Sequence, residues 1–133
     1  MAAPDPRLMD QTLLKLAALR IRERTRSGAA SFADLHRSLL RLLWEACTEG
    51  GLPPHEPMLL SERIHKRLQG IAPTVPAWAC TEAEVTAMVT PCTAAVIEVI
   101  ERTLSDDQAY TVRKVLSRLC DEERVRREAG VSV

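Results

Sequence analysis

The stretch SFADLHRSLLRLLWEACTE, Ser31 to Glu49, decides the fold class of this chain. Its apolar residues recur every three or four positions and fall on one face of a helix, while charged residues occupy the opposite face. The apolar members are Phe32, Leu35, Leu39, Leu42, Leu43 and Ala46. Ser31 is a suitable N-cap, and Gly50 with Gly51 ends the pattern. The stretch therefore predicts an amphipathic α-helix that buries one face against neighbouring helices.

Helical periodicity extends over most of the remaining chain, and no stretch of useful length alternates with the period of two that a strand requires. Glycines and prolines separate four further helical segments. These run from about residue 5 to 26, 60 to 69, 81 to 104 and 105 to 128. With 133 residues, the chain has the size of one domain. We expect a single all-α domain over 1–133, a compact bundle of four long helices plus one short connecting helix, frayed at 1–4 and 129–133.

Two of the predicted helix starts carry a capping box, in which a hydroxyl residue and an acid or amide three positions later cap each other's backbone N–H groups. Thr81 with Glu84 begins one helix, and Ser105 with Gln108 begins the next. Pro91 lies inside the helix that starts at Thr81 and points away from its apolar face. We therefore expect a bend at this proline and not the end of the helix.

The composition disfavours several classes of protein. Lys plus Arg and Asp plus Glu both number 18, so the net charge is zero, which disfavours a dedicated binder of nucleic acid or of an anionic membrane. No apolar run approaches the roughly 20 residues that span a bilayer, and Met1–Met9 lacks the layout of a signal peptide. The four cysteines form no C-x-x-C pair, so we expect reduced thiols. These features predict a cytoplasmic or nuclear protein with no membrane partner.

Sequence motifs for catalysis are missing. The chain contains no nucleophile elbow, metalloprotease helix, Walker loop or dinucleotide-binding glycine pattern, so we expect no enzyme. The candidate zinc ligands are not spaced as the close pairs that metal sites use, so we expect neither a metal nor a cofactor. They are Cys47, His55, His65 and Cys80. His36 lies on the apolar face of its helix, which favours a hydrogen-bonded core histidine. A small-molecule-binding or catalytic bundle around His36 and Cys47 is the second alternative function.

Basic residues form two clusters along the sequence. The first is Arg20, Arg22, Arg24 and Arg26, and the second is Arg63, Lys66 and Arg67. Alternate positions on a helix are about 200° apart, so the first cluster spreads around its helix and forms no continuous track of cations. The segment 50–57 is also longer than the turn of a helix-turn-helix motif. A small helical nucleic-acid-binding regulator that uses both clusters is the first alternative function.

The leading interpretation is a non-enzymatic protein–protein interaction module, such as an adaptor, regulatory subunit, chaperone or inhibitor. The helix over residues 5–26 has an apolar face that covers more than half its circumference, which exceeds what a small bundle is expected to bury. Trp78 lies in a proline-rich loop and Trp44 lies at the edge of an apolar face, and tryptophan is enriched at interface hot spots. The partner is a foreign protein or a second copy of the chain. The expected contact residues are Trp78, Trp44, Leu14 and Ile21, with Arg22 and Arg26 at the rim.

Overall fold

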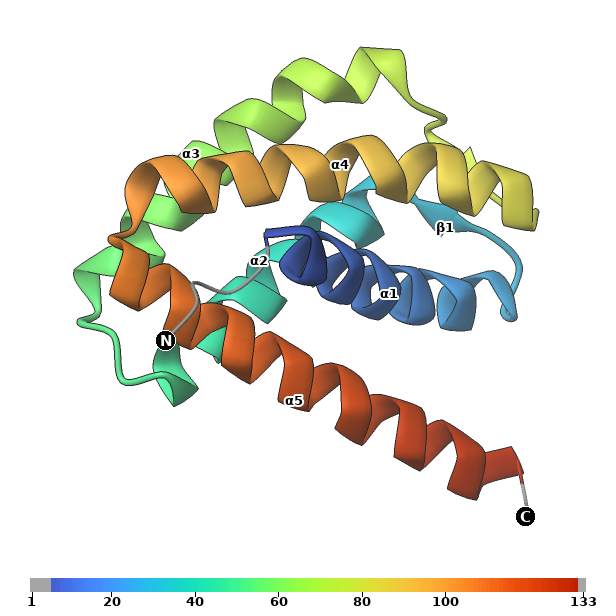
Figure 1. Ribbon diagram of the computed structural model, residues 1–133. Helices are drawn as coiled ribbons and strands as arrows, with labels where there is room; N and C mark the ends of the chain where they lie inside the picture. The colour runs from blue at the N-terminus through green and yellow to red at the C-terminus, as the bar shows by residue number, and fades with distance from the viewer. Residues whose placement is uncertain (1–5, 132–133) are drawn as a thin grey trace.

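All five predicted helices form in the computed structural model, which describes the backbone of residues 6–131 and the side chains of residues 11–128. They are α1 (Pro6–Thr25), α2 (Phe32–Glu49), α3 (His55–Ile71), α4 (Glu82–Thr103) and α5 (Asp106–Val131), with a short 3-10 turn, η1 (Ala72–Thr74), after α3. The helices pack around one core, and the only strands in the described chain have two residues each (Figure 1). The predicted all-α bundle is therefore confirmed.

The two ends of the chain were expected to fray at residues 1–4 and 129–133. Residues 129–131 continue α5 as a helix. Residues 1–4 and 132–133 lie outside the described part of the chain.

α1 lies in the middle of the bundle and contacts α2, α4 and α5 (Figure 1). Its fully buried side chains are Leu13, Leu16, Ala17 and Ile21. Helices on three sides therefore cover this part of the wide apolar face that the sequence predicts. The expectation that the face needs a partner is corrected for these residues, because α5 packs on α1 in addition to α2 and α4.

α3 is longer than the predicted connecting helix. It begins at His55 and has 17 residues, so the bundle contains a fifth long helix where a short one was expected. Pro57 lies in the first turn of α3, where backbone N–H groups have no hydrogen-bond partner within the helix, so the N–H that proline lacks is not missed. The Pro57 ring is buried. The prolines of this region, which suggest a loop in the sequence, therefore mark the beginning of the helix. Gly70, which was expected to end the helix, lies inside its last turn.

α2 and α3 form an antiparallel pair. His36 contacts His65, whereas Trp44, later in α2, shares a groove with Met58, which comes earlier in α3. Gly51 lies in the turn between them with a φ of 73°, a left-handed conformation that glycine adopts without strain. This hairpin differs from a helix-turn-helix motif, whose two helices cross at a steep angle.

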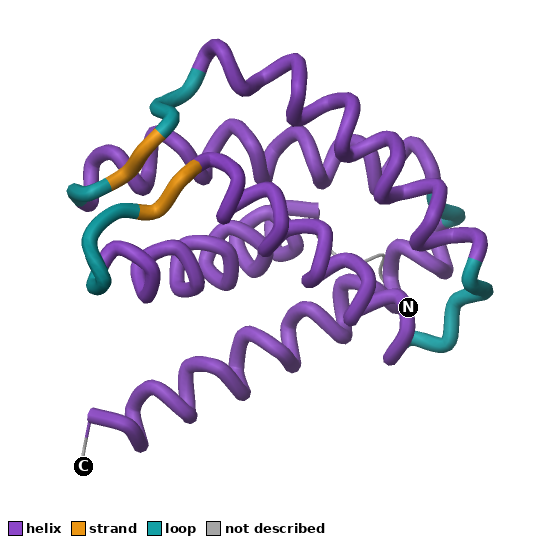
Figure 2. Tube along the Cα trace, turned by 180° about the vertical axis from the view of Figure 1, so that it is seen from behind, coloured by secondary structure: helices purple, strands orange, loops and turns teal. Residues whose placement is uncertain are grey.

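A two-stranded ladder ties the α1–α2 connection to the α3–α4 connection. β1 (Ala30–Ser31) and β2 (Trp78–Ala79) run antiparallel, and the N–H of Phe32 donates to the carbonyl of Ala77 at 2.9 Å. Figure 2 shows the two strands side by side at one end of the bundle. The sequence did not predict them, because strands of two residues leave no periodic pattern.

α4 packs against α1 and α3. Its predicted capping box forms, with Thr81 and Glu84 each accepting from the other's backbone N–H, and the box of Ser105 and Gln108 forms as well. The helix runs unbroken through Pro91. Among the described residues, α4 is the one helix long and apolar enough to span a membrane, by length and composition only, and half of that window is buried inside the bundle. Core helices of globular proteins share these properties, and α4 lies far from the N-terminus.

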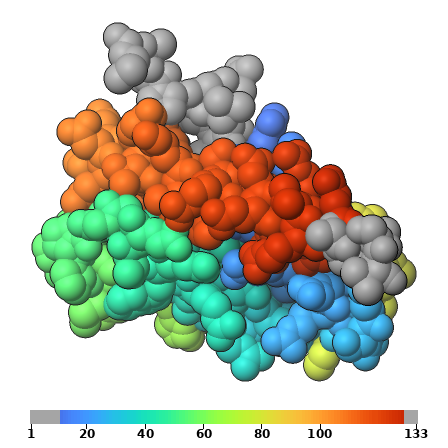
Figure 3. All heavy atoms as spheres, turned by 90° about the horizontal axis from the view of Figure 1, so that it is seen from below, coloured from blue at the N-terminus to red at the C-terminus, as the bar shows by residue number. Residues whose placement is uncertain are grey.

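The first half of α5 packs on the bundle through apolar contacts, and its second half is held by ion pairs and hydrogen bonds of charged side chains. The buried apolar residues are Ala109, Val112, Val115, Leu116 and Leu119. Further along, Arg127 Nη2 donates to the carbonyl of Leu19 at 2.9 Å and to Glu23 at 3.1 Å, both on α1. Figure 3 shows α5 lying across α2 and the end of α1. Ion pairs therefore hold the C-terminal part of α5 on the bundle.

Candidate functional site

An apolar groove of about 690 Å³ runs along the outer side of the α2–α3 pair. Its apolar lining is Leu40, Trp44, Met58 and Leu59. The exposed fractions of Met58, Trp44 and Leu59 are 61%, 40% and 36%. Single exposed apolar residues are normal on a protein surface, but three large ones around one groove mark a candidate binding surface.

Helical spacing explains why α2 contributes apolar side chains to this groove. Leu39 and Leu43 are buried in the core. Leu40 and Trp44 follow them by one position and lie four residues apart, so they share the neighbouring flank of the helix. The antiparallel packing of α3 then places Met58 along the same groove. The core and the groove are therefore adjacent faces of one amphipathic helix.

Met58 and Leu59 are not among the predicted site residues, because they precede the helix that the sequence predicts over about residues 60 to 69. A signal for them was present, since Met58, Leu59 and Leu60 are three consecutive apolar residues. Leu60 is fully buried, and its two predecessors cannot share its face in a helix that begins at His55. Trp44 is the predicted contact residue that the structure places in the groove.

A pair of histidines stands at one end of the groove. His36 Nε2 and His65 Nδ1 lie 3.2 Å apart, a hydrogen bond in which one ring donates to the other. Desolvation, and after it the charge of His65, lowers the pKa of His36 below its ordinary value. The expectation of a core histidine is corrected: His36 is only partly buried, because its position on α2 faces α3 at the surface of the bundle.

Cys47 lacks the properties of a catalytic partner for His36. The Cys47 side chain is fully buried in the core, and burial, with a smaller effect from Glu56, raises its pKa to about 11. A catalytic thiol needs a depressed pKa and access to substrate, and Cys47 has neither. The ring contacts of His36 are with Phe32 and His65. The described geometry therefore gives no support to a site built on His36 and Cys47.

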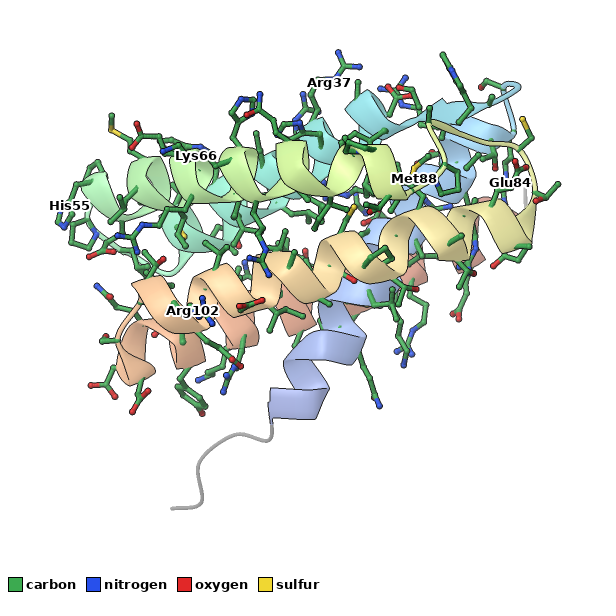
Figure 4. The ribbon with its side chains drawn as sticks, turned by 90° about the horizontal axis from the view of Figure 1, so that it is seen from above. Arg37, His55, Lys66, Glu84, Met88 and Arg102 are labelled. Carbon is green, nitrogen blue, oxygen red and sulfur yellow. The ribbon has the colours of Figure 1, made fainter. Side chains whose placement is uncertain are left out.

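The groove also offers polar groups at its rim. Ser61 Oγ is buried and has no hydrogen-bond partner among the described residues, and Ser61 lines the groove. His55, at the start of α3, lines the groove and lies 3.2 Å from Glu56 (Figure 4). Glu62 supplies a carboxylate to the same rim.

The other predicted contact residues do not share one surface. Ile21 is fully buried, so it cannot reach a partner in the folded chain, and its predicted role is corrected to a core role. Leu14 is partly buried and packs against the core. Trp78 is 60% exposed on β2 and does not line the groove. Arg22 and Arg26 lie at the end of α1, away from the groove lining.

Ion pairs occupy part of the two basic clusters. The paired members are Arg20 with Glu123 at 3.3 Å, Arg22 with Glu82 at 3.0 Å and Arg67 with Glu98 at 2.8 Å. Arg63 donates to Thr103 at 3.0 Å, while Arg24, Arg26 and Lys66 are exposed. Figure 4 shows Lys66 on α3, a different helix from the first cluster. The pairing lowers the free positive charge that a nucleic-acid backbone would meet.

The candidate zinc ligands differ in their exposure to solvent. Cys47 is buried in the core, whereas Cys80 is exposed next to β2 and His55 is exposed at the start of α3. Among the side chains that the structure describes, no group of three or more His, Cys, Asp or Glu residues is arranged to hold a metal ion.

Comparisons with known proteins identify no function for this chain. The chain matches no family model, no curated protein and no solved structure.

Proposed function

We propose that this protein is a non-enzymatic interaction module, such as an adaptor, regulatory subunit, chaperone or inhibitor, that binds another protein through the α2–α3 groove. The observation that supports it is the shared exposure of Trp44, Met58 and Leu59 around one groove. Covering apolar surface that already stands in water contributes roughly 25 cal/mol per Å². Trp and Met are also enriched at protein interfaces. This surface can therefore bind without any unfolding of the bundle.

The groove fits the apolar stripe of a helix in the partner. It lies between two antiparallel helices, and such grooves accept side chains spaced three and four residues apart on a bound helix. The flexible thioether of Met58 adapts to the side chain that it meets. Because the rim carries both Glu62 and histidines, we expect an amphipathic partner helix without a strong net charge.

The test compares three versions of the full chain as bait in extracts of its native cell, at low and high salt. They are the wild type, a groove variant with Trp44→Ala and Met58→Ser, and a control variant with Trp78→Ala, which removes an exposed tryptophan outside the groove. We expect one protein that the wild type and the control retain at both salt concentrations and that the groove variant loses. Apolar contacts survive salt, because screening weakens interactions between charges. Equal retention by all three baits, or loss from the Trp78 variant alone, contradicts the proposal.

Sedimentation and fluorescence identify the occupant of the groove. If it is a second copy, the wild type sediments as a dimer and the groove variant as a monomer. If it is a foreign protein, the wild type is a monomer until that protein is added. In a Trp78→Phe variant, Trp44 is the single tryptophan of the chain, so a blue shift of its emission on binding reports that the groove is covered. An unchanged Trp44 spectrum in the complex contradicts the groove as the binding site.

We infer that the protein works in a reducing compartment, the cytoplasm or the nucleus. Its four cysteines are free thiols, and Cys80 is exposed. An oxidising compartment tends to oxidise or pair such a thiol. Microscopy of the tagged chain tests this inference, and accumulation in a secretory compartment contradicts it.

A further inference from the structure

A polar cleft of about 430 Å³ lies where the end of α1, the length of α2 and the charged part of α5 meet. Figure 3 views the face of the molecule on which these three helices come together. Five arginines line the cleft and no lysine does: Arg20, Arg24, Arg37, Arg41 and Arg126. The cleft shares no lining residue with the α2–α3 groove, so the two surfaces can be tested separately.

Four carboxylates also line the cleft, and each already faces a guanidinium group. The pairs are Glu23 with Arg127 at 3.1 Å, Asp34 with Arg37 at 2.9 Å, Glu45 with Arg20 at 3.6 Å and Glu123 with Arg20 at 3.3 Å. Asp34 also accepts from the backbone N–H of Ser31, and this hydrogen bond is the largest cause of its lowered pKa. All four carboxylates therefore already form ion pairs, and the remaining arginines of the cleft have no carboxylate with which to pair.

Three of the cleft arginines, Arg24, Arg41 and Arg126, form no ion pair with any side chain that the structure describes. They come from α1, α2 and α5, so three helices each direct one unpaired cation to the same hollow. Arg24 acts on Asp34 only through space, where it contributes to the lowered pKa of that carboxyl group. Five arginines and four carboxylates give the lining a net charge of +1, and the unpaired guanidiniums favour a bound anion.

We propose that this cleft binds a compact anion that carries phosphate groups. A guanidinium group presents paired N–H donors that match two phosphate oxygens, which a lysine ammonium does not. Three guanidiniums that approach from three helices suit a ligand with oxygens on several sides. The cleft volume is in the range of small-molecule sites. No aromatic side chain lines the cleft, so a nucleobase finds no ring there to stack on, and the phosphate is the recognised group.

An extended nucleic-acid strand fits the arrangement less well. The second basic cluster, Arg63 to Arg67, lies on α3 and contributes nothing to the cleft lining. A phosphate backbone needs cations along a continuous path, whereas these cations converge on one hollow. The convergence therefore favours a compact ligand.

Binding in this cleft would also fasten α5 to the bundle. Arg126 belongs to the part of α5 that ion pairs such as Arg127 with Glu23 hold on α1. An anion that bridges Arg126 to Arg24 and Arg41 adds a further link between α5 and the two helices beneath it. We therefore expect slower amide exchange at residues 120–128 when the ligand is bound.

The test is calorimetric titration of the full chain with inorganic tripolyphosphate in a phosphate-free buffer. The variants Arg24→Gln, Arg41→Gln and Arg126→Gln each remove one unpaired cation from the cleft, and Lys66→Gln removes an exposed cation on α3 as the matched control. None of the four breaks an ion pair of the described chain, so we expect all of them to fold. The expected result is one site per chain, with a Kd about tenfold higher in each cleft variant and less than about twofold higher in the control.

Amide exchange and competing probes complete the test. Tripolyphosphate should slow exchange at residues 120–128 in the wild type but not in Arg126→Gln, and the groove variant should bind it like the wild type. An absence of binding heat, or equal weakening by Lys66→Gln, overturns the proposal. Duplex DNA binding that depends on Lys66 and Arg41 alike overturns it in favour of nucleic acid. Tighter binding of a polyglutamate peptide than of tripolyphosphate overturns it in favour of carboxylate recognition.

Discussion

His36 and His65 face each other across the contact between α2 and α3, with His36 Nε2 3.2 Å from His65 Nδ1 and the ring centroids 4.9 Å apart. The hydrogen bond requires that at least one ring is neutral, because a charged imidazolium has no acceptor nitrogen. Two charged rings at this distance repel each other. Through this pair, the packing of α3 on α2 depends on the pH of the solution. Because His65 also lines the groove, that end of the groove depends on the pH as well.

Acidification is expected to destabilise the fold through this pair. The folded pKa of His36 is below its ordinary value of 6.5, first because of desolvation and second because of the charge of His65. The unfolded chain then binds the proton more readily, so the stabilisation is fully present above the ordinary pKa and is lost as the pH falls through the lower folded pKa. Urea unfolding at about pH 7.5 and about pH 5 measures this loss.

The matched variants for this prediction are His36→Gln and His55→Gln. We expect the first to reduce the loss of unfolding free energy on acidification and the second to leave it as in the wild type, because His55 lies at the start of α3 and does not contact the pair. An identical pH dependence in His36→Gln and the wild type shows that the pair does not link stability to pH.

Gly50 and Gly70 are expected to respond in opposite directions to alanine. A Cβ at Gly50 would lie 2.7 Å from Thr111 Cγ2 on α5 and 3.0 Å from the Ala46 carbonyl oxygen. Gly50→Ala must therefore displace the Thr111 side chain or α5 itself, at an expected cost of about 1–3 kcal/mol. A Cβ at Gly70 would meet no atom within 4 Å, so Gly70→Ala is expected to stabilise α3 by about 0.5–1 kcal/mol. Thermal unfolding should give Tm shifts of opposite sign, and shifts of the same sign contradict this packing.

The four cysteines are expected to differ in their reactivity toward a thiol reagent. Cys80 is exposed, whereas burial raises the pKa of both Cys47 and Cys92 to about 11. Burial, with a smaller effect from Asp121, also raises the pKa of Cys120. Because the thiolate is the reactive form, we expect fast labelling of Cys80 alone in the native chain and of all four thiols in denaturant. Cys80→Ser should remove the fast phase, and fast native labelling of Cys47 or Cys92 would show that the core is open.

Ile21 and Trp78 were both predicted to contact a partner, and their variants should separate a core role from a surface role. Ile21 is fully buried and Trp78 is 60% exposed. Ile21→Ala leaves a cavity between α1 and its neighbours, at an expected cost of about 2–5 kcal/mol. Trp78→Ala is expected to change the free energy of unfolding by less than about 1 kcal/mol. Chemical denaturation measures both, and similar losses for the two variants would place Trp78 in the core.

The sequence by itself determined the local structure of this protein. The period of three to four residues in Ser31–Glu49, the capping box of Thr81 and Glu84, and the tolerance of α4 for Pro91 involve residues within about one turn of each other. Such short-range preferences act before any long-range contact forms, so they predict that helices exist and where most of them begin. The start of α3 was missed because a proline in a first helical turn looks like a loop residue until the rest of the helix is known.

Only the tertiary structure decided which faces are covered and which residues meet. The core residues of α1, such as Ile21, are buried partly because α5 returns across that helix. The flank of α2 at Trp44 stays exposed because no helix of the described chain covers it. Arg41 and Arg126 line one cleft although they are far apart in the chain. Exposure and convergence depend on the packing of distant helices, and no spacing within a single helix encodes that packing.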